Sequence, residues 1–177
     1  MYHVAVLFGV APPGTPAQNL QLTPYENLGR LQLLPSSAQP LLAFRGVTAG
    51  GQSATFTLLG ESILHGPASC LPSASQCQAI ELKPGQTEEL EFLPPNGQAV
   101  TYQLQLVSIS SSKASAARAA TVFHAESKAG RELLRRKDLT ALAGLRYSPE
   151  QGVLVFAARP ASSARARVVA RLRRHAR

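Results

Sequence analysis

The sequence predicts a mainly β (α+β) protein, in which a small antiparallel β-sandwich or barrel is followed by a C-terminal helix and an additional β-hairpin. Between residues 41 and 110, β-prone runs recur at spacings of roughly 8 to 12 residues, with Gly- and Pro-containing turns between them. After residue 110 the pattern changes to a helical period and then returns to short β-prone runs. The chain has 177 residues, of which 45% are hydrophobic, and this suits a folded domain of ordinary size.

The β-domain is assigned to residues 41–110. Its first two strands, at 41–47 and 53–59, flank a Gly-Gly turn and predict a hairpin. The second run continues toward Ile63 and Leu64. Three more strands are predicted from their alternation and from the turns that separate them, at 79–83, 87–93 and 99–109.

Residues 1–40 are interpreted as an N-terminal strand followed by a Pro-rich linker. The first nine residues alternate like a strand and lack the basic region, long apolar core and cleavage site of a signal peptide. Residues 11–40 contain six prolines, which exclude a helix and favour an extended chain.

Residues 111–160 are expected to form a helix and a β-hairpin. Ser110, Ser111 and Ser112 offer helix caps. A helical stripe of mostly small residues follows within 114–137, formed by Ala116, Ala120, Phe123, Ser127, Gly130 and Leu134. The predicted hairpin has its strands at 142–147 and 152–157.

No catalytic motif is present in the sequence. A Gly-x-Ser-x-Gly elbow, a phosphate-binding glycine loop and a His-Glu-x-x-His pattern are all missing. Glu88, Glu89 and Glu91 are close in sequence, but their spacing predicts the solvent-facing side of a strand. We therefore expect a protein that is not an enzyme and has no catalytic residues, cofactor, metal site or small-molecule substrate.

The two cysteines, Cys70 and Cys77, flank a stretch of Pro, Ser and Gln that is typical of a surface loop. A disulfide between them would close an eight-residue ring, which contributes about 2.5 kcal/mol in the chain-entropy model. Two unrelated thiols are an alternative, and a metal site is a weaker one because only His65 lies nearby. A disulfide would indicate an oxidising, extracytoplasmic compartment.

The charge of the chain is divided unequally. The net charge is +8, but residues 1–107 carry three basic and six acidic side chains, a balance of −3. Residues 108–177 carry fifteen basic and four acidic ones, a balance of +11. Such asymmetry indicates a separate interaction element rather than a basic fold.

The basic tail, residues 161–177, allows three interpretations: a disordered solubilising end, a contact with an anionic membrane surface, or a nucleic-acid contact. Nucleic acid is the less favoured partner, because the β-domain shows no basic face and no interleaving of aromatic and basic residues. The residues that would contact an anionic partner are Arg165, Arg167, Arg171, Arg173, Arg174 and Arg177.

The run from residue 41 to 109 resembles the small periplasmic β-domain of the PilP-like proteins of type IV pilus assembly. The similar segments follow that family's order, and they are 44–47, 53–56, 82–85 and 102–109. The arrangement of linker, cysteine-bearing β-domain and Ala/Arg-rich helix also resembles uncharacterised envelope proteins of high-GC actinobacteria. These resemblances imply a non-catalytic scaffold that links envelope components.

The sequence thus predicts an extracytoplasmic protein-interaction domain of the periplasm or cell envelope, with other envelope proteins as its partners and exposed sheet edges as its docking surface. Because no signal segment is visible, we expect an upstream tethering segment to precede this chain. The alternative is a nucleic-acid-binding protein that uses its basic C-terminal third.

Overall fold

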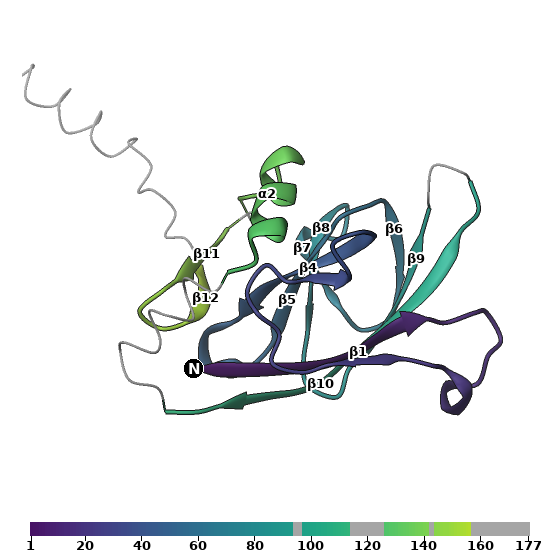
Figure 1. Cartoon of the computed structure of the whole chain (residues 1–177), viewed down its shortest axis with the longest axis horizontal. Helices are drawn as coiled ribbons and strands as arrows, with labels where there is room; N and C mark the ends of the chain where they lie inside the picture. The colour runs from purple at the N-terminus through teal and green to yellow at the C-terminus, as the bar shows by residue number, and fades with distance from the viewer. Residues whose placement is uncertain (94–96, 114–125, 142–143, 157–177) are drawn as a thin grey trace, which may run out of the picture.

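The computed structural model describes residues 1–93, 97–113, 126–141 and 144–156. Two five-stranded antiparallel sheets pack face to face, and one helix and one β-hairpin complete the described part of the chain (Figure 1). The predicted fold class, a small antiparallel β-sandwich with a helix and a hairpin, is confirmed. No helix in the described ranges is long and apolar enough to cross a membrane.

The first sheet, sheet A, is organised around the two longest strands of the chain. β1 (Tyr2–Val10) and β10 (Val100–Ser111) pair over their whole common length, with a bulge between Ala5 and Val6. Three shorter strands complete the order β2-β1-β10-β9-β6, and they are β2 (Thr23–Tyr25), β9 (Thr87–Phe92) and β6 (Ser62–His65).

The second sheet, sheet B, is built from a continuous stretch of chain. Its order is β3-β4-β5-β8-β7. The strands are β3 (Leu33–Pro35), β4 (Pro40–Val47), β5 (Ala54–Leu58), β8 (Gln76–Leu82) and β7 (Ser69–Ser73). Two short 3-10 turns lie in the connections, η1 (Ala17–Asn19) and η2 (Ala49–Gly51).

The hydrophobic core lies between the two sheets. Alternate side chains of each strand point inward, as the period of a β-strand requires. The rings of Phe8 and Tyr102 stack with their centroids 5.5 Å apart, and those of Phe44 and Phe56 lie 5.4 Å apart. The largest fully buried side chains include Phe8, Phe56, Leu34, Leu42, Ile80, Leu82, Leu90, Leu104 and Leu106.

The Pro-rich segment 11–40 is more than the linker that its composition predicts. It supplies β2 to sheet A and β3 to sheet B, so residues 1–40 form part of the same sandwich as residues 41–110. Its prolines are compatible with strands because Pro24 lies in an outer strand and Pro35 and Pro40 lie at strand ends. The leucines between these prolines are buried, namely Leu28, Leu31, Leu33 and Leu34.

Three local predictions also differ from the structure. The cysteine segment is a β-hairpin, β7–β8, instead of a surface loop. Ser110 and Ser111 continue β10 and do not cap a helix. Glu88 lies on the buried face of β9 with Leu90, so the expected row of three solvated carboxylates is wrong for this residue.

The C-terminal extension contains the predicted helix and hairpin. The helix α2 (Lys128–Arg136) begins at the N-cap Ser127, whose Oγ accepts a hydrogen bond from the Gly130 N–H at 3.1 Å. The part of the predicted helix at 114–125 lies outside the described residues. The hairpin, β11 (Leu145–Ser148) and β12 (Val153–Phe156), is confirmed.

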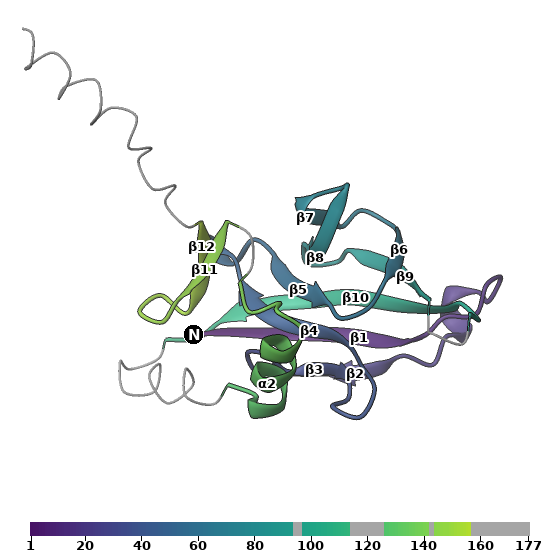
Figure 2. The ribbon, with the colours of Figure 1, turned by 90° about the horizontal axis from the view of Figure 1, so that it is seen from above.

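The helix packs against the outer face of sheet B (Figure 2). Leu134 is 1% exposed and lies in a cluster with Leu31, Leu33, Ala43 and Leu59. Gly130 faces the same surface, and a Cβ at this position would overlap with the carbonyl oxygen of Leu31. The glycine, which weakens an isolated helix, is therefore required here for close approach to the sheet.

Residues at a bulge in β4 contact the segment that follows α2 and the β11–β12 hairpin. Arg45 lies at this bulge, and its guanidinium donates hydrogen bonds to the carbonyl oxygens of Leu139 at 2.9 Å and Thr140 at 2.6 Å. The next residue, Gly46, has a φ of 138° and lies against Leu154 of β12. The extension is thus joined to the sandwich by buried polar contacts as well as by packing.

We predict that Gly130→Ala lowers the free energy of unfolding by about 1–2 kcal/mol, because a backbone overlap outweighs the gain of about 1 kcal/mol in helix propensity. Chemical denaturation monitored by circular dichroism measures this change. Lys128→Ala, at an exposed position of the same helix, is the control and should change stability by less than about 0.5 kcal/mol. A stabilising Gly130→Ala would contradict the packing described here.

Candidate functional site

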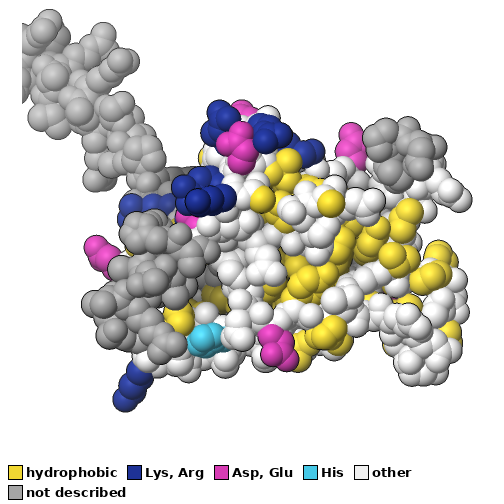
Figure 3. Space-filling model, in the orientation of Figure 1, with side chains coloured by type: hydrophobic (Ala, Val, Ile, Leu, Met, Phe, Trp, Pro, Cys, Tyr) yellow, Lys and Arg dark blue, Asp and Glu magenta, His cyan; other side chains and the backbone are white. Residues whose placement is uncertain are grey.

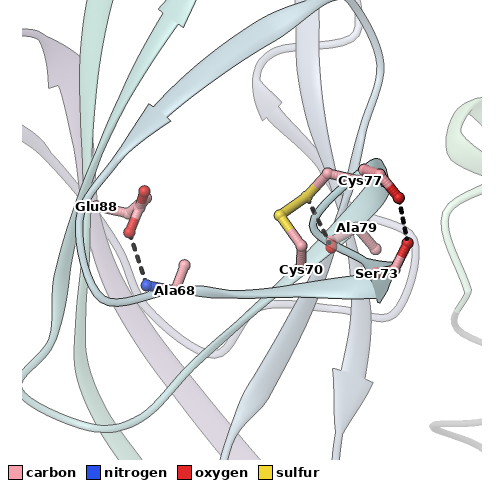
Figure 4. Close-up of a disulfide and its surroundings, with 7 residues drawn as sticks. Ala68, Cys70, Ser73, Cys77, Ala79 and Glu88 are labelled. Atoms are coloured by element: carbon pink, nitrogen blue, oxygen red, sulfur yellow. Dashed lines mark hydrogen bonds between the residues drawn. A yellow bond between two sulfur atoms is a disulfide. The ribbon is translucent and has the colours of Figure 1, made fainter.

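The two predicted site cysteines are joined in a disulfide. The Cys70 and Cys77 sulfur atoms are 2.06 Å apart, and the bridge connects β7 to β8 (Figure 4). β7 is an outer strand of sheet B, so the disulfide fastens the edge of that sheet. A disulfide is compatible with an oxidising, extracytoplasmic location.

The predicted anionic-partner site lies outside the described residues. This applies to all six of its arginines, Arg165, Arg167, Arg171, Arg173, Arg174 and Arg177. The described residues contain ten basic and ten acidic side chains, so the net charge of +8 comes entirely from the other residues. The membrane and nucleic-acid interpretations of the tail therefore stay predictions.

Three of the four basic side chains of α2 form ion pairs, and one of these joins Arg131 to Glu126 at 3.4 Å. Arg135 and Arg136 both pair with Glu132, at 2.9 Å and 3.1 Å. Lys137 follows the helix, and its Nζ donates a hydrogen bond to the Leu59 carbonyl oxygen at 2.9 Å. Basic and acidic side chains lie side by side over α2 in Figure 3, and the helix carries four basic residues and one acidic residue.

The titratable side chains of the described residues are scattered. Within the described ranges, no group of three or more His, Cys, Asp or Glu residues could hold a metal ion. His65 lies beside Glu91, with Nε2 and Oε2 3.5 Å apart, on the exposed face of sheet A. This pair is solvent-accessible and belongs to two neighbouring strands, β6 and β9, so its geometry is that of a surface ion pair.

A groove of about 520 Å³ separates the N-terminal end of β1 from the β11–β12 hairpin. Four of its polar side chains, His3, Asn27, Arg30 and Tyr147, make contacts with one another or with neighbouring residues. His3 contacts the Asn27 Oδ1 and the Ser112 Oγ, each at 2.9 Å. The Arg30 guanidinium lies 4.2 Å from the ring centroid of Tyr147 and pairs with Glu126 at 2.6 Å. Burial raises the pKa of Tyr147, against the opposing effect of Arg30. These contacts stabilise the groove, and none of them identifies a ligand.

The four outer strands of the sandwich are poor templates for another strand. They have only three to five residues each. β2 contains Pro24, β3 ends at Pro35 and β7 contains Pro72, and β6 is followed closely by Pro67. Short length and proline are the usual protection against pairing at a sheet edge, because proline has no N–H to donate.

The C-terminal half of β10 is different, because one of its sides is open. β9 pairs with β10 only as far as Gln105, and the turn before β9 then bonds to Leu106. In that turn Gly85 N–H donates to the Leu106 carbonyl oxygen at 2.7 Å, and Gln86 accepts from the Leu106 N–H at 3.0 Å. Beyond Leu106, no strand in the described part of the chain covers this side of β10.

Backbone geometry identifies which groups face the open side. The Ser112 N–H donates to the Met1 carbonyl oxygen at 2.9 Å, so Ser112 faces β1. Because the direction alternates along a strand, Ser110 and Ser108 also face β1, whereas Ile109 and Ser111 face away from it. The open edge of β10, defined as residues 107–111, thus presents the N–H and carbonyl groups of Ile109 and Ser111.

The side chains of the open edge suit strand pairing. The segment Val-Ser-Ile-Ser-Ser has no charged residue and no proline, and its two apolar residues are β-branched. Val107 is 47% exposed, and Ile109 is half-buried against the core. Sequence reasoning predicted this strand but missed the open edge, whose only sequence signal is the absence of charge and proline.

We predict that the double variant Cys70→Ser with Cys77→Ser has a free energy of unfolding about 2.5 kcal/mol lower than the wild type. This is the amount by which closing the ring destabilises the unfolded chain in the chain-entropy model. Denaturant titration of oxidised wild type, reduced wild type and the double variant measures the loss. Reduction should lower the stability of the wild type to that of the double variant and leave the double variant unchanged. Equal stability of oxidised and reduced wild type would contradict a stabilising bridge.

In comparisons with known proteins, no family model, curated protein sequence or solved structure matches the chain.

Proposed function

We propose that the protein is a non-catalytic interaction module of the cell envelope, and that it binds an extended segment of another envelope protein by strand addition to the open edge of β10. The observation that carries the proposal is the contrast between this edge and the four outer strands. Those strands are short and contain or adjoin proline, whereas residues 107–111 are proline-free, uncharged and uncovered on one side within the described chain.

The disulfide supports the envelope as the compartment. Disulfides persist in secreted and periplasmic proteins and are rare in reducing compartments. The Cys70–Cys77 bridge lies on an outer strand and is partly exposed, so a reductant could reach it. An oxidising compartment would keep this sheet edge fastened, which suits a module that works outside the cytoplasm.

The chemistry of the edge defines the partner segment. Pairing with Ile109 and Ser111 requires a partner strand whose own N–H groups are free, so the segment must lack proline at those positions. The edge offers no charge to neutralise an acidic or basic partner, which favours a segment of apolar and hydroxyl side chains. In this recognition mode backbone bonds supply affinity and side chains supply specificity.

The size of the edge limits its affinity. Two residues that face outward can make up to four backbone hydrogen bonds, and each contributes about 0.5–1.5 kcal/mol net. Such a contact is modest alone, so the partner gains further affinity from side chains that pack on Val107 and Ile109. A reversible scaffold contact is consistent with this magnitude.

We predict that Ser111→Pro weakens partner binding by about tenfold, because it removes an outward N–H without removing a bond to β1. Ser111→Thr is the matched control: it keeps the N–H and should bind within about twofold of the wild type. The partner is first identified by photo-cross-linking from position 111 in envelope fractions. Its affinity for purified wild type and for both variants is then measured by calorimetry.

Three outcomes would contradict the proposal. One is equal affinity of the proline and threonine variants. Another is a cross-link from position 111 to a second copy of this chain alone. The third is a salt-dependent gel shift with nucleic acid that disappears when residues 160–177 are deleted, with no envelope protein cross-linked; that result would favour the basic C-terminal third as the functional element.

A further inference from the structure

One carboxyl group of sheet A lies in the core of the sandwich. Glu88 is 0% exposed, lies opposite Leu104 of β10 and projects from the same buried face of β9 as Leu90. Within the described part of the chain, one of its oxygens, Oε1, has no hydrogen-bond partner. Charged groups are almost never buried without a partner, because removing an ionised carboxylate from water is costly. The position of Glu88 therefore needs an explanation beyond packing.

The other oxygen of Glu88 holds the loop that connects the two sheets. Oε2 accepts a hydrogen bond from the Ala68 N–H at 2.8 Å (Figure 4). Gly66 packs so tightly against the carboxyl group that a Cβ at this position would overlap with Oε2. The loop 66–68 links β6 of sheet A to β7 of sheet B, so one side chain fastens the crossover at this edge of the sandwich.

The disulfide limits how far this crossover can move. Ala68 is two residues before Cys70, whose bridge to Cys77 ties β7 to β8. Figure 4 shows Glu88 and the disulfide at the two ends of the short segment from Ala68 to Cys70. Loss of the Glu88 contact would therefore release the loop 66–68 while β7 stays in place.

We propose that Glu88 makes a pH-sensitive contact with the loop 66–68. Its protonated, neutral form keeps the loop closed on the core, and its ionisation opens the loop to water. The charged carboxylate would be hydrated only when the loop moves away. The neutral acid avoids that cost while Oε2 still accepts the Ala68 bond.

The groups near Glu88 that lower its pKa have a smaller effect than its burial, which raises the pKa. Burial raises the pKa of Glu88, and the Ala68 hydrogen bond and the nearby His65 lower it to a smaller extent. Glu89, the next residue of β9, raises it further. On the neighbouring strand, the residue opposite is Leu104, which is uncharged, and Cys70 and Cys77 do not titrate because they are oxidised.

The direction of the pH dependence follows from linkage. Because the pKa of Glu88 is higher in the folded chain than in the unfolded one, its contribution to stability is fully present below the ordinary pKa of a glutamate. That contribution is lost as the pH rises through the raised folded pKa. The loop 66–68 should therefore be closed in acid and open more often toward neutral and alkaline pH.

Hydrogen exchange of the Ala68 amide in the intact oxidised chain tests the proposal. We expect the protection factor of Ala68, corrected for the intrinsic rate at each pH, to fall about tenfold or more between pH 4 and pH 8. Amides of Leu104 and Leu7, on strands that pair centrally, serve as internal references for global unfolding. Glu88→Gln should remove the dependence, because its amide is neutral and its oxygen can still accept the Ala68 bond.

Glu89→Gln is the matched control, since it removes the adjacent carboxylate from the exposed face of the same strand. It should keep the pH dependence and move it only slightly to lower pH, because the charge of Glu89 raises the pKa of Glu88. A protection factor that does not change with pH in the wild type, or one that still changes in Glu88→Gln, would overturn the proposal. A carbon-13 titration of the wild-type carboxyl groups gives a test that needs no variant. A Glu88 midpoint at or below the ordinary pKa of a glutamate would equally refute it.

Discussion

The pairing of β1 with β10 is the interaction on which the rest of the structure depends. It joins the first ten residues to residues 102–111 and forms the centre of sheet A. β2 and β9 are added on either side of this pair. The inward side chains of the two strands, among them Phe8 and Leu104, form one wall of the core against which sheet B packs. The open edge of β10 exists because β1 pairs with β10 as far as Ser111, whereas β9 pairs with it only as far as Gln105.

The sequence was informative wherever structure is set locally. Alternation and turn residues predicted the strands that became β4, β5, β8, β9 and β10, and the β11–β12 hairpin as well. It was less informative where long-range packing decides. The prolines of residues 11–40 led to the prediction of a linker, although strand ends tolerate proline. The leucines between these prolines are buried and help to cover the core. Glu88 was misassigned for a similar reason: a strand with acidic residues on both faces gives no local sign of which face is buried.

The candidate site was predictable only in part. The spacing of Cys70 and Cys77 allowed a disulfide, because a hairpin brings two residues seven apart within reach of each other. The open edge of β10 was not predictable, since its existence depends on where β9 ends relative to β1, two strands that are distant in sequence. The fit of Gly130 against Leu31 likewise joins residues that no local pattern connects, and it explains why a helix-weakening residue occupies a buried helical position.

The connectivity of the two sheets has a consequence for the order of events during synthesis. Sheet B lies within residues 33–82, so all its strands are available once that stretch has been made. Sheet A cannot be completed until β10 appears, about a hundred residues after β1. Until then β1 is an apolar strand without its main neighbour. The Cys70–Cys77 disulfide lies in sheet B and does not link β1 to β10. The N-terminal strand is therefore made early but receives its main neighbour, β10, only when the last strand of the sandwich has been made.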